Sequence, residues 1–137
     1  MQLRQHILGT LAAAAVMWAA AGIWHQLILA KFYAQATGAT HEGTGIILIA
    51  YLILGALMSF LYSRISLGGR AGRPVPEGLK FGVLIGVLWV FPHELALAGA
   101  HGESLLYPFQ NAAVHMVEQG LGGIAIALVH GKSGATR

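Results

Sequence analysis

The chain has 137 residues, of which 56% are hydrophobic and only 9% are charged, and its mean hydropathy is +0.67. A water-soluble domain has about 25% charged residues, so this composition argues against a soluble enzyme, a nucleic-acid-binding protein and a disordered chain. The absence of cysteine excludes disulfides, thiolate metal sites and cysteine nucleophiles. We therefore predict an integral membrane protein.

Four apolar stretches have about the length, roughly 20 residues, that a membrane-crossing helix needs. They are residues 7–30, 45–62, 81–100 and 105–129. Arg4 and the alanine-rich run after it resemble a secretory signal peptide, but the apolar run continues to Ala30 and predicts a retained helix. We expect one all-α membrane domain over residues 1–137, folded as a four-helix transmembrane bundle.

The eight basic residues predict the orientation of this bundle. With a cytoplasmic N-terminus, only Lys31 lies outside, as the positive-inside rule requires. The other seven lie inside: Arg4, Arg64, Arg70, Arg73, Lys80, Lys132 and Arg137. We expect a bacterial-type inner membrane with both termini cytoplasmic, so the net charge of +3 reflects topology and not a nucleic-acid partner. Glycine and proline predict an irregular cytoplasmic loop over residues 63–80.

The ends of the first and third spans are similar. His25–Ala30 matches His93–Ala98 at a histidine, two leucines and an alanine. Two parallel helix-hairpin repeats would explain the match and would place His25 and His93 at equivalent depths. A chance match between two apolar stretches is the alternative.

Five ionisable side chains lie inside the predicted spans. They are His25, His93, Glu94, His115 and Glu118. An ionised side chain at the middle of a membrane helix costs roughly 2.5–3.5 kcal/mol, so these groups must face the bundle, pair or stay neutral. At about 1.5 Å per residue they fall in one layer, mostly in the outer half of the bilayer. We therefore expect them to converge.

Helical spacing places the polar and small residues of each span on one face. These faces are Trp18, Gly22 and His25; Tyr51, Gly55, Ser59 and Tyr62; Gly82, Gly86 and His93; and Asn111, His115, Glu118 and Gly122. The glycine pair of the third span suits close packing, either within the chain or in a homodimer. Pro92 predicts a kink, because it lacks an N–H and displaces the carbonyl of Leu88.

A transition metal ion or haem is the ligand that these residues favour. His25, His93, His115 and Glu118 offer the ligand types that zinc, copper or iron accept, although no HExxH motif is present. For haem, His25 and His93 would be the axial ligands. Glu94, Tyr51 and Asn111 would relay protons or hydrogen-bond to the ligands.

Two other functions fit the same residues. One is a small proton- or cation-coupled transporter or channel, because glutamate and histidine chains carry protons in such proteins. We expect it to work as a homodimer. The other is an accessory subunit of a larger membrane complex, in which these side chains only hold helices together. An enzyme is the least expected function, since the sequence shows no nucleophile or oxyanion arrangement.

The layout of spans resembles that of the small four-span bacterial inner-membrane proteins of unknown function. The similarity extends to the stretch GLKFGVLIG, residues 78–86, which follows a basic, proline-containing loop. The resemblance implies a four-helix membrane fold and carries no activity with it.

Overall fold

The computed structural model describes residues 3–28, 44–65, 73–102 and 104–131, and nearly all of these are helical. The helices are α1 (Leu3–Gly22), the π-helix η1 (Ile23–Ile28), α3 (Thr44–Ile65), α4 (Pro74–Trp89), α5 (Phe91–His101) and α6 (Leu106–Gly131). Four helical stretches are long and apolar enough to cross a membrane: Leu3–His25, Gly45–Ile65, Pro74–His101 and Leu106–Gly131. The expected all-helical fold with four candidate spans is confirmed.

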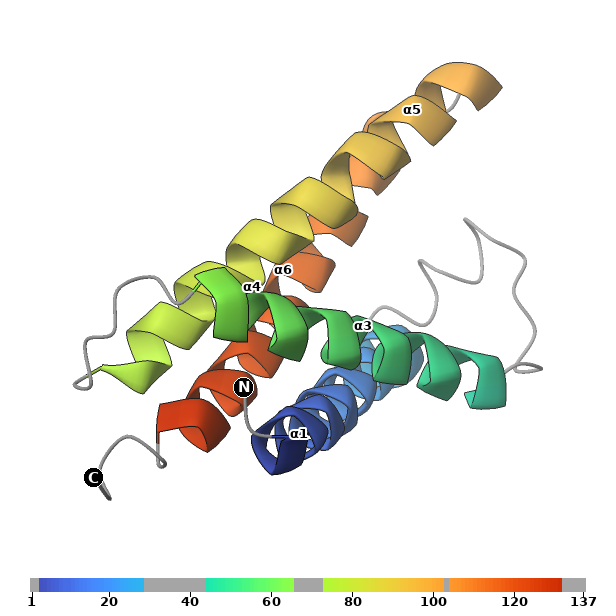
Figure 1. Cartoon of the computed structure of the whole chain (residues 1–137). Coiled ribbons are helices and arrows are strands. Elements are labelled where there is room, and N and C mark those ends of the chain that lie inside the picture. Colours follow the sequence, from blue (N-terminus) through green and yellow to red (C-terminus); the bar gives the residue numbers. More distant parts are fainter. Residues whose placement is uncertain (1–2, 29–43, 66–72, 103, 132–137) are drawn as a thin grey trace.

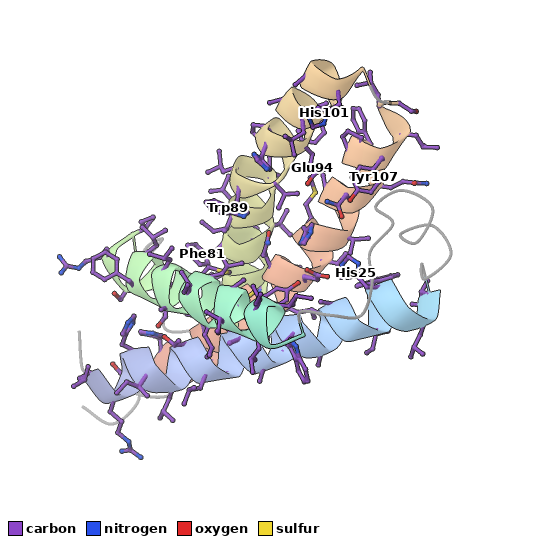
Figure 2. The ribbon with its side chains drawn as sticks, turned by 90° about the vertical axis from the view of Figure 1, so that its right-hand side faces the viewer. His25, Phe81, Trp89, Glu94, His101 and Tyr107 are labelled. Carbon is purple, nitrogen blue, oxygen red and sulfur yellow. The ribbon has the colours of Figure 1, made fainter. Side chains whose placement is uncertain are left out.

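The helices form two hairpins that cross each other (Figure 1). In one hairpin α1 packs on α3, in the other α4 and α5 pack on α6, and α1 joins the two by packing on α6. Figure 2 shows α5 and the start of α6 extending beyond the first hairpin as a two-helix arm. An edge-to-face contact between the rings of Phe91 and Phe109, with centroids 5.0 Å apart, connects the two helices of this arm.

Glycine sets the distance between α4 and α6. Gly78, Gly82 and Gly86 are spaced by four residues on α4, and all three are buried. A Cβ at Gly82 would overlap the carbonyl oxygen of Gln119, and one at Gly78 would overlap that of Gly123. Only glycine permits this backbone approach. The pair that predicted close packing therefore serves contact within the chain.

The predicted small and polar face of the second span is also confirmed. Tyr51 and Ser59 of α3 are buried, Tyr62 is half-buried, and Gly55 lies between them against α1. A Cβ at Gly55 would lie 2.8 Å from the carbonyl oxygen of Thr10. The polar side chains of this face therefore point into the bundle.

On the first span the predicted packing face is wrong at Trp18 and Gly22. Trp18 is 41% exposed, and a Cβ at Gly22 would meet no atom within 4 Å. The buried face of α1 consists of Gly9, Ala13, Ala14, Met17, Ala20 and Ala21. Small apolar side chains allow helices to approach closely. In α1 the face with these small residues packs on the neighbouring helices, and the indole of Trp18 lies outside this contact.

The third span departs from the sequence prediction at its start. Residues 63–80 were expected to form an irregular loop, but α3 continues to Ile65 and α4 already begins at Pro74. Proline is compatible with the first helical turn, where the backbone N–H groups have no helical acceptor. The expected interruption near Pro92 is present, since α4 ends at Trp89 and α5 begins at Phe91.

The beginnings of α1 and α4 and the ends of α3 and α6 lie on the same side of the molecule (Figure 1). Arg4, Arg64, Arg73 and Lys80 are exposed there. We call this side the basic end. Lys31, Arg70, Lys132 and Arg137 lie outside the described residues. The two-repeat arrangement stays a prediction.

Candidate functional site

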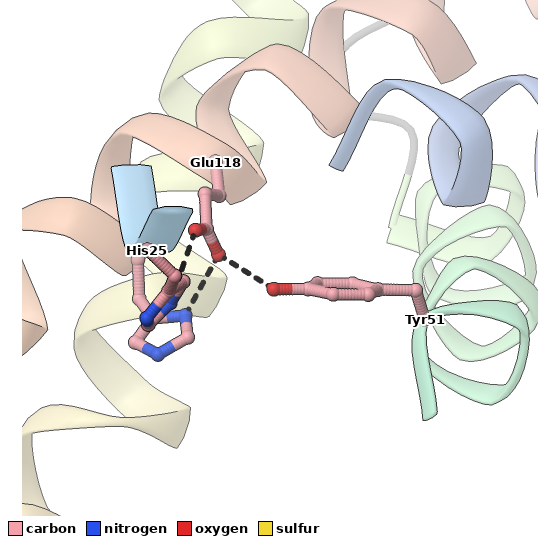
Figure 3. Close-up of polar contacts among 4 residues, drawn as sticks. His25, Tyr51 and Glu118 are labelled. Carbon is pink, nitrogen blue, oxygen red and sulfur yellow. Dashed lines mark hydrogen bonds and ion pairs between the residues drawn. The ribbon is translucent and has the colours of Figure 1, made fainter. Parts of the chain in front are cut away.

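A glutamate with no exposed surface lies at the centre of the candidate site. Glu118 is near the middle of α6, and its relative exposure is 0%. Its Oε2 accepts a hydrogen bond of 2.9 Å from the hydroxyl of Tyr51 (Figure 3). Because Tyr51 belongs to α3 and Glu118 to α6, this bond connects the two hairpins.

A histidine one turn earlier on α6 contacts the same oxygen. Nδ1 of His115 lies 2.9 Å from Oε2 of Glu118, and the His115 side chain is 21% exposed. The contact has the length of an ion pair but not the direction of a hydrogen bond, so Nδ1 has no hydrogen-bond partner among the described residues. A spacing of i, i+3 places both side chains on one face of the helix.

The third helix of the site contributes His25. Its Nε2 lies 4.0 Å from Oε1 of Glu118, and its side chain is 34% exposed. The rings of His25 and His115 are tilted by 53°, with centroids 6.4 Å apart. We call His25, Tyr51, His115 and Glu118 the Glu118 cluster. Of the two histidines in this cluster, His25 is the more exposed.

The π-helix η1 accounts for the direction of His25. In a regular α-helix His25 would share a face with Trp18, seven residues earlier, and Trp18 points outward. A π-helix bonds residue i to i+5 and holds more residues per turn, so the side chains after Gly22 are rotated back toward the buried Met17 side. Single π turns of this kind are frequent at functional sites. No pattern in the sequence distinguishes this turn from an α-helix.

The two oxygens of the Glu118 carboxyl group differ, because Oε2 accepts a hydrogen bond from Tyr51 and Oε1 accepts none among the described residues. This Oε1 atom is buried. A buried charge is costly unless it is paired, so the carboxylate is stable only when an imidazolium accompanies it or when it carries a proton itself. The Glu118 cluster places two imidazole rings beside this carboxyl group.

The other predicted site residues lie elsewhere. His93 is exposed on α5 and Glu94 is half-buried there, in the arm where Figure 2 labels Glu94. Neither has an ion pair or hydrogen bond to the Glu118 cluster. Asn111 is buried on α6, about two turns from Glu118. Of the four predicted metal ligands the structure thus brings together His25, His115 and Glu118.

These groups do not form a metal site as they stand. Within the described ranges, no group of three or more histidine, aspartate and glutamate side chains is arranged to hold a metal ion. Tyr51, which the sequence placed in a supporting role, donates the hydrogen bond that the carboxylate accepts within the described residues.

Two histidines that the sequence analysis passed over lie at the basic end. The backbone carbonyl of His6 on α1 accepts a hydrogen bond from Ser59 of α3, and Nε2 of His130 on α6 lies 3.3 Å from the same hydroxyl. The predicted first span began at residue 7 and the predicted fourth span ended at residue 129, so both histidines fell one residue outside. Attention to the helix ends would have found them.

Comparison with models of protein families, with curated proteins and with solved structures finds no match for this chain. The class of the protein is therefore argued from its helices alone. The chain is a multi-span membrane protein with four candidate spans.

Proposed function

We propose that the protein is a small membrane proton channel or carrier, and that Glu118 is its proton-binding residue. One observation supports this above all. The carboxyl group of Glu118 is fully buried in the middle of a candidate span, and it contacts both the hydroxyl of Tyr51 and the imidazole of His115. Intramembrane carboxylates are costly and are typical of proton relays.

The contacts suggest how a proton is exchanged. A proton that arrives at the partly exposed ring of His25 is 4.0 Å from Oε1 of Glu118, a separation that a small rotation of either side chain closes. Once Glu118 is neutral, its desolvation cost falls. When it releases the proton, the hydroxyl of Tyr51 and the ring of His115 stabilise the carboxylate. Each member of the cluster thus stabilises one state of the cycle.

The distribution of charge supports an orientation for this exchange. Exposed arginine and lysine side chains gather at the basic end, and such an excess is typical of the cytoplasmic side of a bacterial inner membrane. In that orientation both termini are cytoplasmic, and His25 lies at the opposite end of α1 on the outer side. Protons would then reach Glu118 from outside.

A metal ion or haem is less well supported. The sequence grouped three histidines with Glu118 for this purpose, but His93 lies in the arm and the remaining groups do not form a metal site. The metal and haem functions stay predictions, which elemental analysis and an absorption spectrum of the purified protein test.

Proton flux into liposomes tests the proposal. The purified protein is reconstituted with a trapped pH-sensitive dye, and a potassium gradient with valinomycin supplies the driving force. We expect the wild type to acidify the interior and Glu118→Gln, which keeps the shape but cannot ionise, to abolish the flux. Glu94→Gln is the matched control, because it makes the same chemical change outside the cluster.

Two results would overturn the proposal. One is a folded wild-type protein that moves no protons. The other is a flux that Glu118→Gln leaves unchanged or that Glu94→Gln lowers equally. If Glu118→Gln changes only the thermal unfolding temperature, the carboxylate serves helix packing alone.

A further inference from the structure

A second group of polar side chains lies at the basic end, on the same three candidate spans that carry the Glu118 cluster. Ser59 of α3 is fully buried. Its Oγ lies 3.3 Å from Nε2 of His130 on α6 and donates a hydrogen bond of 3.4 Å to the backbone carbonyl of His6 on α1. Thr10 follows His6 by one helical turn. We call His6, Thr10, Ser59 and His130 the Ser59 cluster.

A glycine allows these groups to meet. A Cβ at Gly9 would lie 2.8 Å from Oγ of Ser59 and 3.4 Å from Nε2 of His130. Even the smallest side chain at this position would push against the hydroxyl group. The sequence therefore leaves room for an imidazole and a hydroxyl directly on the backbone of α1.

Two atoms of the Ser59 cluster are open to a further hydrogen bond. Nδ1 of His6 and Oγ1 of Thr10 are buried and have no hydrogen-bond partner within the described ranges. Buried polar atoms without partners are costly, and sites that only hold helices together are usually satisfied. A group that binds and releases protons, by contrast, needs lone pairs that its neighbours do not occupy.

Titratable groups of α1 and α3 lie close to His130, and a titratable group of α4 lies close to the one on α3. His6 of α1 lies within electrostatic range of it. The ring of Tyr62 on α3 is 5.7 Å from its ring, centroid to centroid, and Tyr62 is itself within electrostatic range of Glu77 on α4. The Ser59 cluster thus contains an imidazole with other titratable groups close to it.

An apolar layer separates the two clusters. Met17 comes between Thr10 and His25 along the first span, and Ile126 comes between Glu118 and His130 on α6; both have no exposed surface and belong to one buried apolar cluster. Met17 covers Gly122, one turn from Glu118, since a Cβ at Gly122 would lie 2.7 Å from Sδ of Met17. Glu118 and His130 are 12 residues apart on α6, or about 18 Å. A proton cannot cover this distance in one hydrogen bond, so water must enter the layer for it to pass.

We propose that the Ser59 cluster is a second proton-exchange site on the cytoplasmic side, and that the layer around Met17 closes the passage between it and Glu118. This inference rests on the proposed function of Glu118. A proton leaves the Glu118 carboxyl group, crosses the hydrated layer on water, and binds the imidazole of His130. His130 then releases it to the cytoplasm and returns to its neutral form.

The liposome assay tests both parts of this proposal. We expect His130→Asn to slow the flux by about tenfold or more, on the scale that positioned proton-transfer groups contribute, while His93→Asn, the matched control on α5, keeps wild-type flux. Met17→Ala should raise the flux several-fold, because a smaller side chain lets water enter the layer. Ser59→Ala, a smaller change than His130→Asn, should slow the flux with the fold intact.

The side from which the Ser59 cluster is reached gives an independent readout. Because the chain has no cysteine, Ser59→Cys introduces the single thiol. A small membrane-impermeant thiosulfonate should label it in inside-out vesicles and leave it unlabelled in right-side-out vesicles. A role in packing alone would not produce this asymmetry.

The outcomes separate the two proposals. If Glu118→Gln leaves the flux unchanged, the proposed function fails. If Glu118→Gln abolishes the flux while Ser59→Ala and His130→Asn keep it, the second site alone is wrong. Because Ser59 is fully buried, an absence of labelling from both sides would show that water does not reach it and would overturn the second site. Labelling of Ser59→Cys from the outer side, or an unchanged flux in Met17→Ala, would show that Met17 does not close the passage.

Discussion

The hydroxyl of Tyr51 donates a 2.9 Å hydrogen bond to Glu118 across 67 residues of sequence, and it does so between the two hairpins. This bond serves stability as well as the site, because both partners are buried. A hydrogen bond to a charged group contributes about 1.5–3 kcal/mol, and one between neutral groups about 0.5–1.5 kcal/mol. Its strength therefore reports the charge of Glu118.

A double-mutant cycle measures that strength. We expect Tyr51→Phe to lower the free energy of unfolding by about 1–3 kcal/mol, and the effect should largely disappear in a Glu118→Leu background, in which the side chain has no acceptor for the hydroxyl. Unfolding of the wild type, both single variants and the double variant in detergent gives the coupling energy. Additive effects of the two substitutions would contradict the bond.

The close approach of α4 and α6 leads to a second prediction. A methyl group at Gly82 would overlap the backbone of Gln119, so Gly82→Ala should separate the helices and lower the stability by about 1–3 kcal/mol, as overpacking does. At Gly99 of α5 a Cβ meets nothing within 4 Å. Gly99→Ala should be neutral or stabilise the protein by about 0.5–1 kcal/mol, since alanine is the better helix former.

Thermal unfolding of the two glycine variants, measured side by side, checks this prediction. Equal unfolding temperatures would mean that α4 and α6 do not pack through Gly82. The comparison controls for helix propensity, because both substitutions replace a helical glycine by alanine.

Much of the fold follows from hydrophobic length and helical period. Both depend only on local sequence, and they predicted the four spans and the inward faces of α3 and α6. They also brought Glu118, His115 and Tyr51 into one region, since a buried carboxylate in a membrane must face its neighbours.

The errors arose where tertiary contacts decide the outcome. The sequence placed the packing face of the first span on the side of Trp18, because regular α-helical spacing puts Trp18 and His25 on one face. The turn that contains His25 is a π-helix, which no recognisable residue pattern predicts. His93 was grouped with the site because its position along the third span puts it at about the same depth in the membrane as the other polar residues. Depth alone does not determine which way a helix faces, and it does not predict that α5 extends beyond α1. His6 and His130 were missed because span ends are the least certain part of a hydropathy profile.

The aromatic pair of the arm permits a third prediction. Phe91 and Phe109 form the edge-to-face contact between α5 and α6, and such pairs contribute about 0.5–1.5 kcal/mol beyond their buried area. We expect Phe91→Leu to increase hydrogen exchange at the amides of α5 while the amides of α3 keep their protection. Trp89→Leu is the control, because Trp89 is 66% exposed. Equal exchange in the two variants would show that the ring contact does not hold the arm.

The orientation of the bundle can be tested with single cysteines, because the native chain has none. Leu3 at the basic end is 71% exposed, and Ser104 at the opposite end is also exposed. If the basic end is cytoplasmic, an impermeant maleimide should label Ser104→Cys in intact cells and Leu3→Cys only after the membrane is opened. Both substitutions leave every basic residue in place, so the charge distribution that sets the orientation is unchanged. The reverse labelling would invert the direction of proton entry, and His25 would then face the cytoplasm.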